Sequence, residues 1–179
     1  MVSKRQLSVG RPLVWVGIAV LSAGLAVGAW FLKSSGIEAG VKGANKVAAS
    51  TVKKDLAPSL TGSEVQEPMS EEASDELQRV VQARILDDNP GLRTIRIWTA
   101  NGTLIYSSAG ERTGTRGGDD HGIRLATTDE GTTTSIVPAS DLGDLDIYTP
   151  LRIGGGREPV AAVEVVQSYA PIFEAAGQP

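Results

Sequence analysis

The chain has 179 residues and a formal net charge of -4, with 17 Lys and Arg against 21 Asp and Glu, and it contains no cysteine. The lack of cysteine excludes disulfides and thiolate metal sites. The excess of acidic residues argues against nucleic-acid binding, because affinity for phosphate backbones needs clustered Lys and Arg.

The first predicted element is an uncharged apolar stretch of 20 residues, 13–32, with the sequence LVWVGIAVLSAGLAVGAWFL. At about 1.5 Å per residue, a helix of this length crosses a hydrocarbon core of about 30 Å. Three basic residues precede it, Lys4, Arg5 and Arg11, and such basic flanks stay in the cytoplasm. We therefore predict a cytoplasmic tail over residues 1–12, a transmembrane helix in the cell membrane over 13–32, and an extracytoplasmic location for the rest of the chain.

The same stretch has two other interpretations. A cleaved signal peptide has a shorter apolar core of roughly 7–15 residues and ends at small residues, for which Val27 and Ala29 would serve. A buried helix of a soluble protein would not explain the basic flank. The length favours a retained anchor. Gly24 and Gly28 form a GxxxG pair, which lets two membrane helices approach closely, although small residues are common in any membrane span. We expect this pair to be the dimerisation face of a homodimer.

Two helices are predicted after the apolar stretch. Residues 33–57 carry apolar side chains at three- and four-residue spacing, and Pro58 ends that pattern. Residues 58–70 are rich in Pro, Ser and Gly, which is typical of a loop. Ser70 then provides an N-cap for an amphipathic helix over residues 71–88.

From residue 94 the apolar period changes to two, which indicates strands. Residues 94–99 lead into Asn101-Gly102, a strong hairpin signal because both residues accept positive φ, and residues 103–108 return as the second strand. The Gly-rich, charged segment 109–125 is typical of a long loop. Three further strands and a last helix are predicted at 132–137, 145–153, 159–168 and 169–176. Helices followed by five strands predict an α+β fold, with helices on one face of a five-stranded antiparallel sheet.

Two segments carry a resemblance to a known family. Residues 95–106, IRIWTANGTLIY, form an apolar hairpin with an aromatic residue in each strand, and residues 145–172 carry Tyr148, Pro150, Tyr169 and Pro171 at a characteristic spacing. This pattern resembles the extracytoplasmic PAS-like, or single Cache, sensor domains of bacterial transmembrane signalling proteins. The resemblance implies a membrane-proximal helix and loop over residues 33–70 and a PAS-like sensor domain over residues 71–176. It also implies that the domain binds a small molecule and passes a conformational signal across the membrane.

Members of that family usually continue into a second membrane span. A cytoplasmic histidine kinase, a diguanylate cyclase or phosphodiesterase, or a chemoreceptor signalling region then follows. This sequence ends at Pro179, where such a span would start, so we expect either a fragment or a single-span protein. The chain has no G-x-S-x-G, H-E-x-x-H or P-loop motif, and we expect neither enzymatic activity nor a cofactor in it. The alternative is an envelope protein that binds another protein through its sheet edge or acidic surface, with no small ligand.

Six residues are predicted to bind the ligand: Arg96, Trp98, Tyr106, Arg112, His121 and Tyr148. In such a site the arginine pairs with a carboxylate and the tryptophan forms a wall. The alternative for these two residues is a stacked pair on a solvent-facing strand. Each buried tyrosine hydroxyl needs a partner, which either a ligand or the core could supply.

The basic loop at 112–124 would suit a small organic anion, or it is a solvated surface loop. Adjacent Asp119, Asp120 and His121 point apart and are too few to hold a transition metal, so no metal site is expected.

Overall fold

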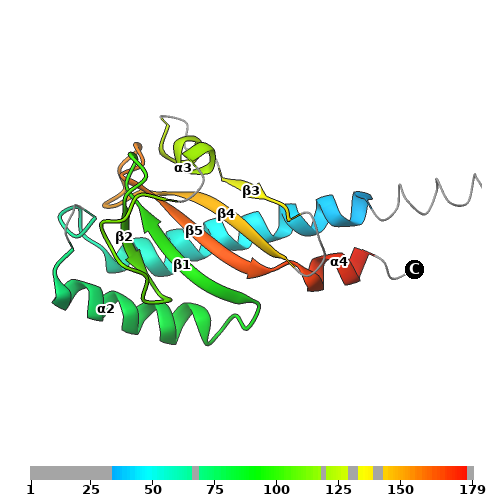
Figure 1. Cartoon of the computed structure of the whole chain (residues 1–179), viewed down its shortest axis with the longest axis horizontal. Helices are drawn as coiled ribbons and strands as arrows, with labels where there is room; N and C mark the ends of the chain where they lie inside the picture. The colour runs from blue at the N-terminus through cyan, green and yellow to red at the C-terminus, as the bar shows by residue number, and fades with distance from the viewer. Residues whose placement is uncertain (1–33, 66–68, 118–119, 129–132, 139–142, 177–179) are drawn as a thin grey trace, which may run out of the picture.

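A five-stranded antiparallel sheet lies at the centre of the structure, a computed structural model that describes residues 34–65, 69–117, 120–128, 133–138 and 143–176 (Figure 1). The predicted α+β class, with helices and a five-stranded antiparallel sheet, is confirmed. The predicted membrane segment, with Gly24 and Gly28, lies outside the described residues. Within the described part of the chain, no helix is long and apolar enough to cross a membrane.

The strand order is β2-β1-β5-β4-β3, so the last strand in the chain is the central one. The strands are β1 (Leu92–Trp98), β2 (Leu104–Ser107), β3 (Thr134–Ile136), β4 (Asp144–Leu151) and β5 (Ala161–Ser168). β5 pairs with β1 on one side and β4 on the other, and its first six residues are buried. Its nearly continuous apolar sequence is what a strand covered on both faces requires.

The β1–β2 hairpin forms where it was predicted, but its turn differs from the expected one. Among the described residues only glycines have positive φ, and Gly102 is one of them at 79°, so Asn101 does not adopt that conformation. The Thr99 amide donates to the Thr103 carbonyl at 2.9 Å, and the Gly102 amide donates to the Thr99 carbonyl at 3.0 Å. The connection is therefore a three-residue loop in which glycine occupies the left-handed position.

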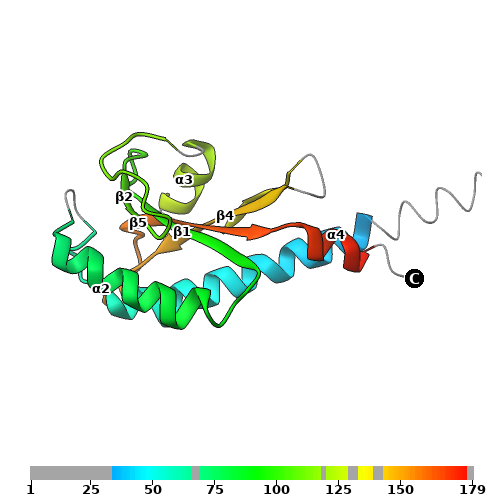
Figure 2. The same ribbon diagram turned by 60° about the horizontal axis from the view of Figure 1, so that its bottom comes forward.

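Two long helices cover one face of the sheet (Figure 2). The first runs through residues 34–51 and continues as the π-helix η1 (Val52–Leu56) and the 3-10 helix η2 (Ala57–Ser59). The second is α2 (Glu71–Val81), which continues as the π-helix η3 (Gln82–Leu86). The side chain of the predicted N-cap, Ser70, accepts a hydrogen bond from the Ala73 amide at 3.2 Å. Apolar side chains from both helices form the main core with the inward-facing residues of the sheet.

The opposite face of the sheet carries a helix that was not predicted. Residues 109–125 were expected to form one long loop, but only the part to residue 117 is described as irregular, and α3 spans Asp120–Thr127. Ile123 and Ala126 lie one turn apart on α3 and are buried against Trp98 and Tyr148. Burial of these two side chains stabilises a helix in a sequence whose glycines and charges are typical of a loop.

Candidate functional site

Four of the six predicted ligand residues lie on strands, and they are divided between the two faces of the sheet. Arg96 on β1 and Tyr148 on β4 are each the direct cross-strand partner of Glu164 on β5. Trp98 lies two residues along β1 from Arg96 and therefore on the same face. This face is the one that α3 covers, and the structure brings three of the six predicted ligand residues together on it.

Glu164 is the centre of this group, and it is a charged residue with only 4% of its surface exposed. One carboxylate oxygen accepts a hydrogen bond from Trp98 Nε1 at 2.7 Å, and the other accepts from Arg96 Nη1 at 3.1 Å. A buried carboxylate needs such donors, because its desolvation is costly unless it is paired and hydrogen-bonded. The tryptophan and the arginine on β1 provide them.

Arg96 also holds a second carboxylate, which comes from the loop after β2. Its Nε and Nη2 atoms lie 2.5 and 3.1 Å from the two carboxylate oxygens of Glu111, and the Ser107 hydroxyl donates to Glu111 at 2.7 Å. The hydrogen bond from Arg96 lowers the pKa of Glu111. Desolvation opposes the charge on Arg96, but its bonds to Glu111 and the charge of Glu164 outweigh that effect and raise the pKa of Arg96. An anionic ligand at this guanidinium would have to displace Glu111.

The remaining space between the sheet and α3 is filled with apolar side chains. Trp98 and Tyr148 are 5% and 2% exposed, and they form a second small core with Leu104, Ile123, Ala126 and Ala162. The wall expected for a ligand pocket is therefore packed against protein in this structure.

The other three predicted residues do not join this group. Tyr106 faces the main core under the opposite side of the sheet, and its hydroxyl donates to Gln78 Oε1 at 2.7 Å. Burial raises the pKa of Tyr106. Arg112 is exposed in the loop after β2, and His121 is exposed on α3, where its Nδ1 lies 3.0 Å from Arg124 Nη2. A ligand role for any of the six stays a prediction.

Sequence reasoning missed Glu164, Glu111 and Asp146 as members of this face. Glu164 had a visible signal, since it is the one charged residue in the apolar segment PVAAVEVVQS. Asp146 lies on β4, two residues from Tyr148, and its pKa is raised, mainly by burial and then by the charge of Glu164. Among the described residues there is no group of three or more His, Asp or Glu side chains arranged to hold a metal ion.

No protein-family model matches this chain, and a search of curated proteins finds no significant match.

Proposed function

We propose that the described domain is the extracytoplasmic input domain of a membrane-anchored signalling protein, which binds a small molecule and passes a conformational change through its terminal helices. One observation supports this most directly. The helix that follows the apolar segment and the last helix, α4 (Ala170–Ala176), lie side by side at one end of the domain (Figure 1). A Cβ placed on Gly36 would lie 3.0 Å from Ala176 Cβ, and one placed on Gly40 would lie 2.6 Å from Ile172 Cγ2.

This arrangement suits signal transfer for a physical reason. The first helix packs along the sheet through Ile37, Val41 and Ala44, and it ends near the far side of the domain with Val52 and Leu56 in the core. A shift of the sheet relative to this helix would therefore change the position of the first helix relative to α4, at the end of the domain where both helices lie. A ligand causes such a shift only if its affinity differs between the two arrangements.

The location can be tested with single cysteines, because the natural chain has none. Glu38→Cys and Glu174→Cys lie at exposed positions of the first helix and α4. In intact bacterial cells, both should react with a maleimide that cannot cross the membrane, whereas Ser3→Cys in the N-terminal tail should react only after permeabilisation. The reverse pattern would disprove the extracytoplasmic location.

The signalling step can be tested with the same two cysteines together. Spin labels at positions 38 and 174 report the separation of the first helix from α4 in the full chain. A screen of organic acids and amino acids should yield a compound that raises the midpoint of thermal unfolding and changes this distance distribution. A compound that binds without changing the distribution would contradict signal transfer by these helices.

A second candidate function has one specific observation in its favour. β3 lies at the edge of the sheet, and Ile136 and Val137 at this edge are 40% and 45% exposed. An edge strand with exposed apolar side chains can pair with another chain. The envelope-interaction function would be favoured if no compound stabilises the domain and Val137→Lys abolishes binding to a defined protein partner.

A further inference from the structure

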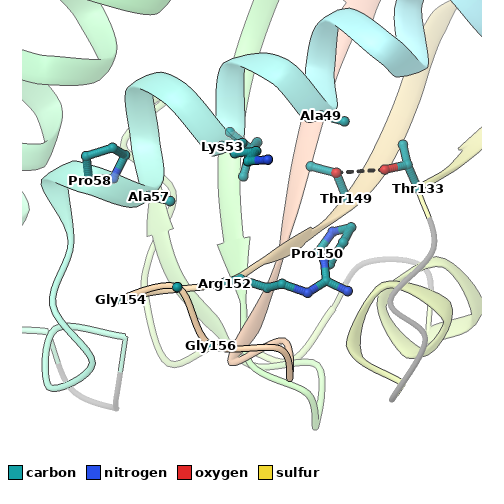
Figure 3. A pocket seen from close by; sticks show the side chains of 12 residues that line it. Ala49, Lys53, Ala57, Pro58, Thr133, Thr149, Pro150, Arg152, Gly154 and Gly156 are labelled. Carbon is teal, nitrogen blue, oxygen red and sulfur yellow. Dashed lines mark hydrogen bonds between the residues drawn. The ribbon is translucent and has the colours of Figure 1, made fainter.

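A cleft beside the first helix, on the side of the sheet opposite α3, was not anticipated from the sequence. Its volume is about 640 Å³, and it opens between the C-terminal half of the first helix and the C-terminal end of β4 (Figure 3). In Figure 3 the helix forms one wall with Lys53, and β4 and the glycine turn at residues 154–156 form the other with Arg152. The cleft is therefore separate from the face that holds Arg96 and Glu164.

The cleft lies where β4 extends past the part of β3 that the structure describes. β3 covers β4 only from Asp146 to Tyr148, whereas β4 continues to Leu151. Pro150 is paired with Ala162 of β5 but lies beyond the described pairing with β3, and proline is tolerated at such edge positions of a sheet. The facing part of the helix changes to the π-helix η1 at Val52, a local distortion that is frequent at functional sites.

The lining combines positive charge with an apolar floor. Lys53 is exposed and has no ion pair with any residue that the structure describes. Arg152 donates from Nε to the Arg157 carbonyl at 2.8 Å, which orients its guanidinium group along the cleft. No Asp or Glu among the described residues lines the cleft, and its apolar members are Ala49, Val52, Ala57, Pro58 and Pro150.

Two hydroxyl groups add polar partners at one end of the cleft. The Thr133 and Thr149 hydroxyl oxygens lie 2.8 Å apart in a hydrogen bond, as Figure 3 shows. Each hydroxyl can donate once and accept twice. Because Thr149 is only 1% exposed, the half-buried Thr133 hydroxyl is the one that a third group can reach. The cleft thus offers cations, a hydroxyl and apolar surface to one small molecule.

We propose that this cleft binds a small organic carboxylate with an apolar body. The carboxylate lies close to Lys53 and Arg152, and the body packs against the alanine and proline side chains of the two walls. Lys53 contrasts with Arg96 in this respect, because the Arg96 guanidinium already holds two carboxylates of the protein itself, whereas Lys53 forms no ion pair with a described residue. The role of the cleft as the ligand site of a sensor rests on the proposed function. Binding of a carboxylate in the cleft can be measured whether or not the domain is a sensor.

The position of the cleft also fits the proposed signal. A ligand held there contacts both the first helix and β4, so its affinity depends on how the helix lies against the sheet. Such dependence is the condition for a ligand to shift a conformational equilibrium.

Benzoate is a suitable probe, with uncharged benzamide as the control for apolar contact alone. In the full isotope-labelled chain in lipid nanodiscs, benzoate should cause saturable NMR shifts at the amides of Thr149 and residues 154–156. Lys53→Gln should weaken benzoate binding by about fivefold, the size expected for one exposed charge pair. Lys54→Gln is the matched control, because Lys54 is exposed on the same helix and does not line the cleft, and it should change affinity by less than about twofold.

Three results would overturn the inference. The first is the absence of saturable shifts up to about 10 mM benzoate, where a ligand with a Kd near 1 mM is mostly bound. The second is equal weakening by the two lysine variants, or equal binding of benzamide. The third is a set of shifts confined to Ile123 and Ala126 on α3, which would leave the sensor proposal intact and move its ligand to the other face. Binding in the cleft without a change in the helix distances would support the inference and contradict the proposed function.

Discussion

Replacing Glu164 with alanine should lower the free energy of unfolding by about 2–4 kcal/mol, although the residue is a charge in an apolar strand. The buried indole N–H of Trp98 donates to Glu164 at 2.7 Å, and leaving such a donor without an acceptor costs about 1–3 kcal/mol. Arg96 also loses a partner at 3.1 Å, but it retains Glu111 and its side chain is 23% exposed. We assign about 1 kcal/mol to that second loss. Urea denaturation of the full chain in detergent micelles, followed by far-UV circular dichroism, measures the change.

Two variants separate the hydrogen bond from the charge. Glu164→Gln keeps an oxygen that can accept from Trp98, so it should cost only about 1 kcal/mol. Glu158→Ala removes an exposed carboxylate in the connection between β4 and β5 and should change stability by less than about 0.5 kcal/mol. A double-mutant cycle with Trp98→Phe should give a coupling energy of about 1–2 kcal/mol. A coupling energy of zero, or a Glu164→Ala cost no larger than that of Glu158→Ala, would refute the reasoning.

Three further predictions concern other parts of the fold. Burial raises the pKa of Asp146, so the folded state holds this proton to higher pH than the unfolded state, and ionisation of Asp146 costs stability as pH rises. Asp146→Asn should therefore raise the free energy of unfolding at neutral pH by less than about 1 kcal/mol, seen as a higher midpoint of thermal unfolding, and the gain should vanish below pH of about 4. Gly43→Ala, where a Cβ meets nothing within 4 Å, should stabilise the first helix by about 0.5–1 kcal/mol. Gly40→Ala, whose Cβ would lie 2.6 Å from an α4 methyl carbon, should destabilise the protein by about 1–3 kcal/mol, and urea denaturation measures both changes. Tyr106→Phe removes the hydroxyl bond to Gln78 and should cost about 1 kcal/mol in urea denaturation, and a cost of zero would contradict a structural role for that hydroxyl.

Local patterns predicted the elements well, because each element has a period that its own residues express. The change of apolar spacing near residue 94 separates the helices from the strands, and the expected strand at 145–153 appears as Asp144–Leu151. The N-cap at Ser70 and the hairpin at Gly102 depend on a few neighbouring residues, so they were visible too. The α3 helix was missed because its stability comes from packing against Trp98 and Tyr148, which lie far away in the sequence.

The candidate site was predicted less completely, for the same reason. Alternation places Arg96 and Trp98 on one face of β1, and that part of the prediction is a property of a single strand. Their carboxylate partners come from β5 and from the loop after β2, at sequence separations of 68, 66 and 15 residues. Nothing local indicates that Glu164 and Glu111 converge on one guanidinium.

By itself, the sequence determined the α+β class, the approximate extent of the elements other than α3, and the shared face of Arg96 and Trp98 on β1, since these follow from apolar period, turn residues and caps. Only the tertiary structure decided that β5 pairs between β1 and β4, that carboxylates of the protein occupy Arg96, and that a cleft opens beside Lys53. These features depend on which distant segments meet and on where one strand ends before its neighbour. Short-range periodicity contains no information about such contacts, because they are selected by the burial of the whole core.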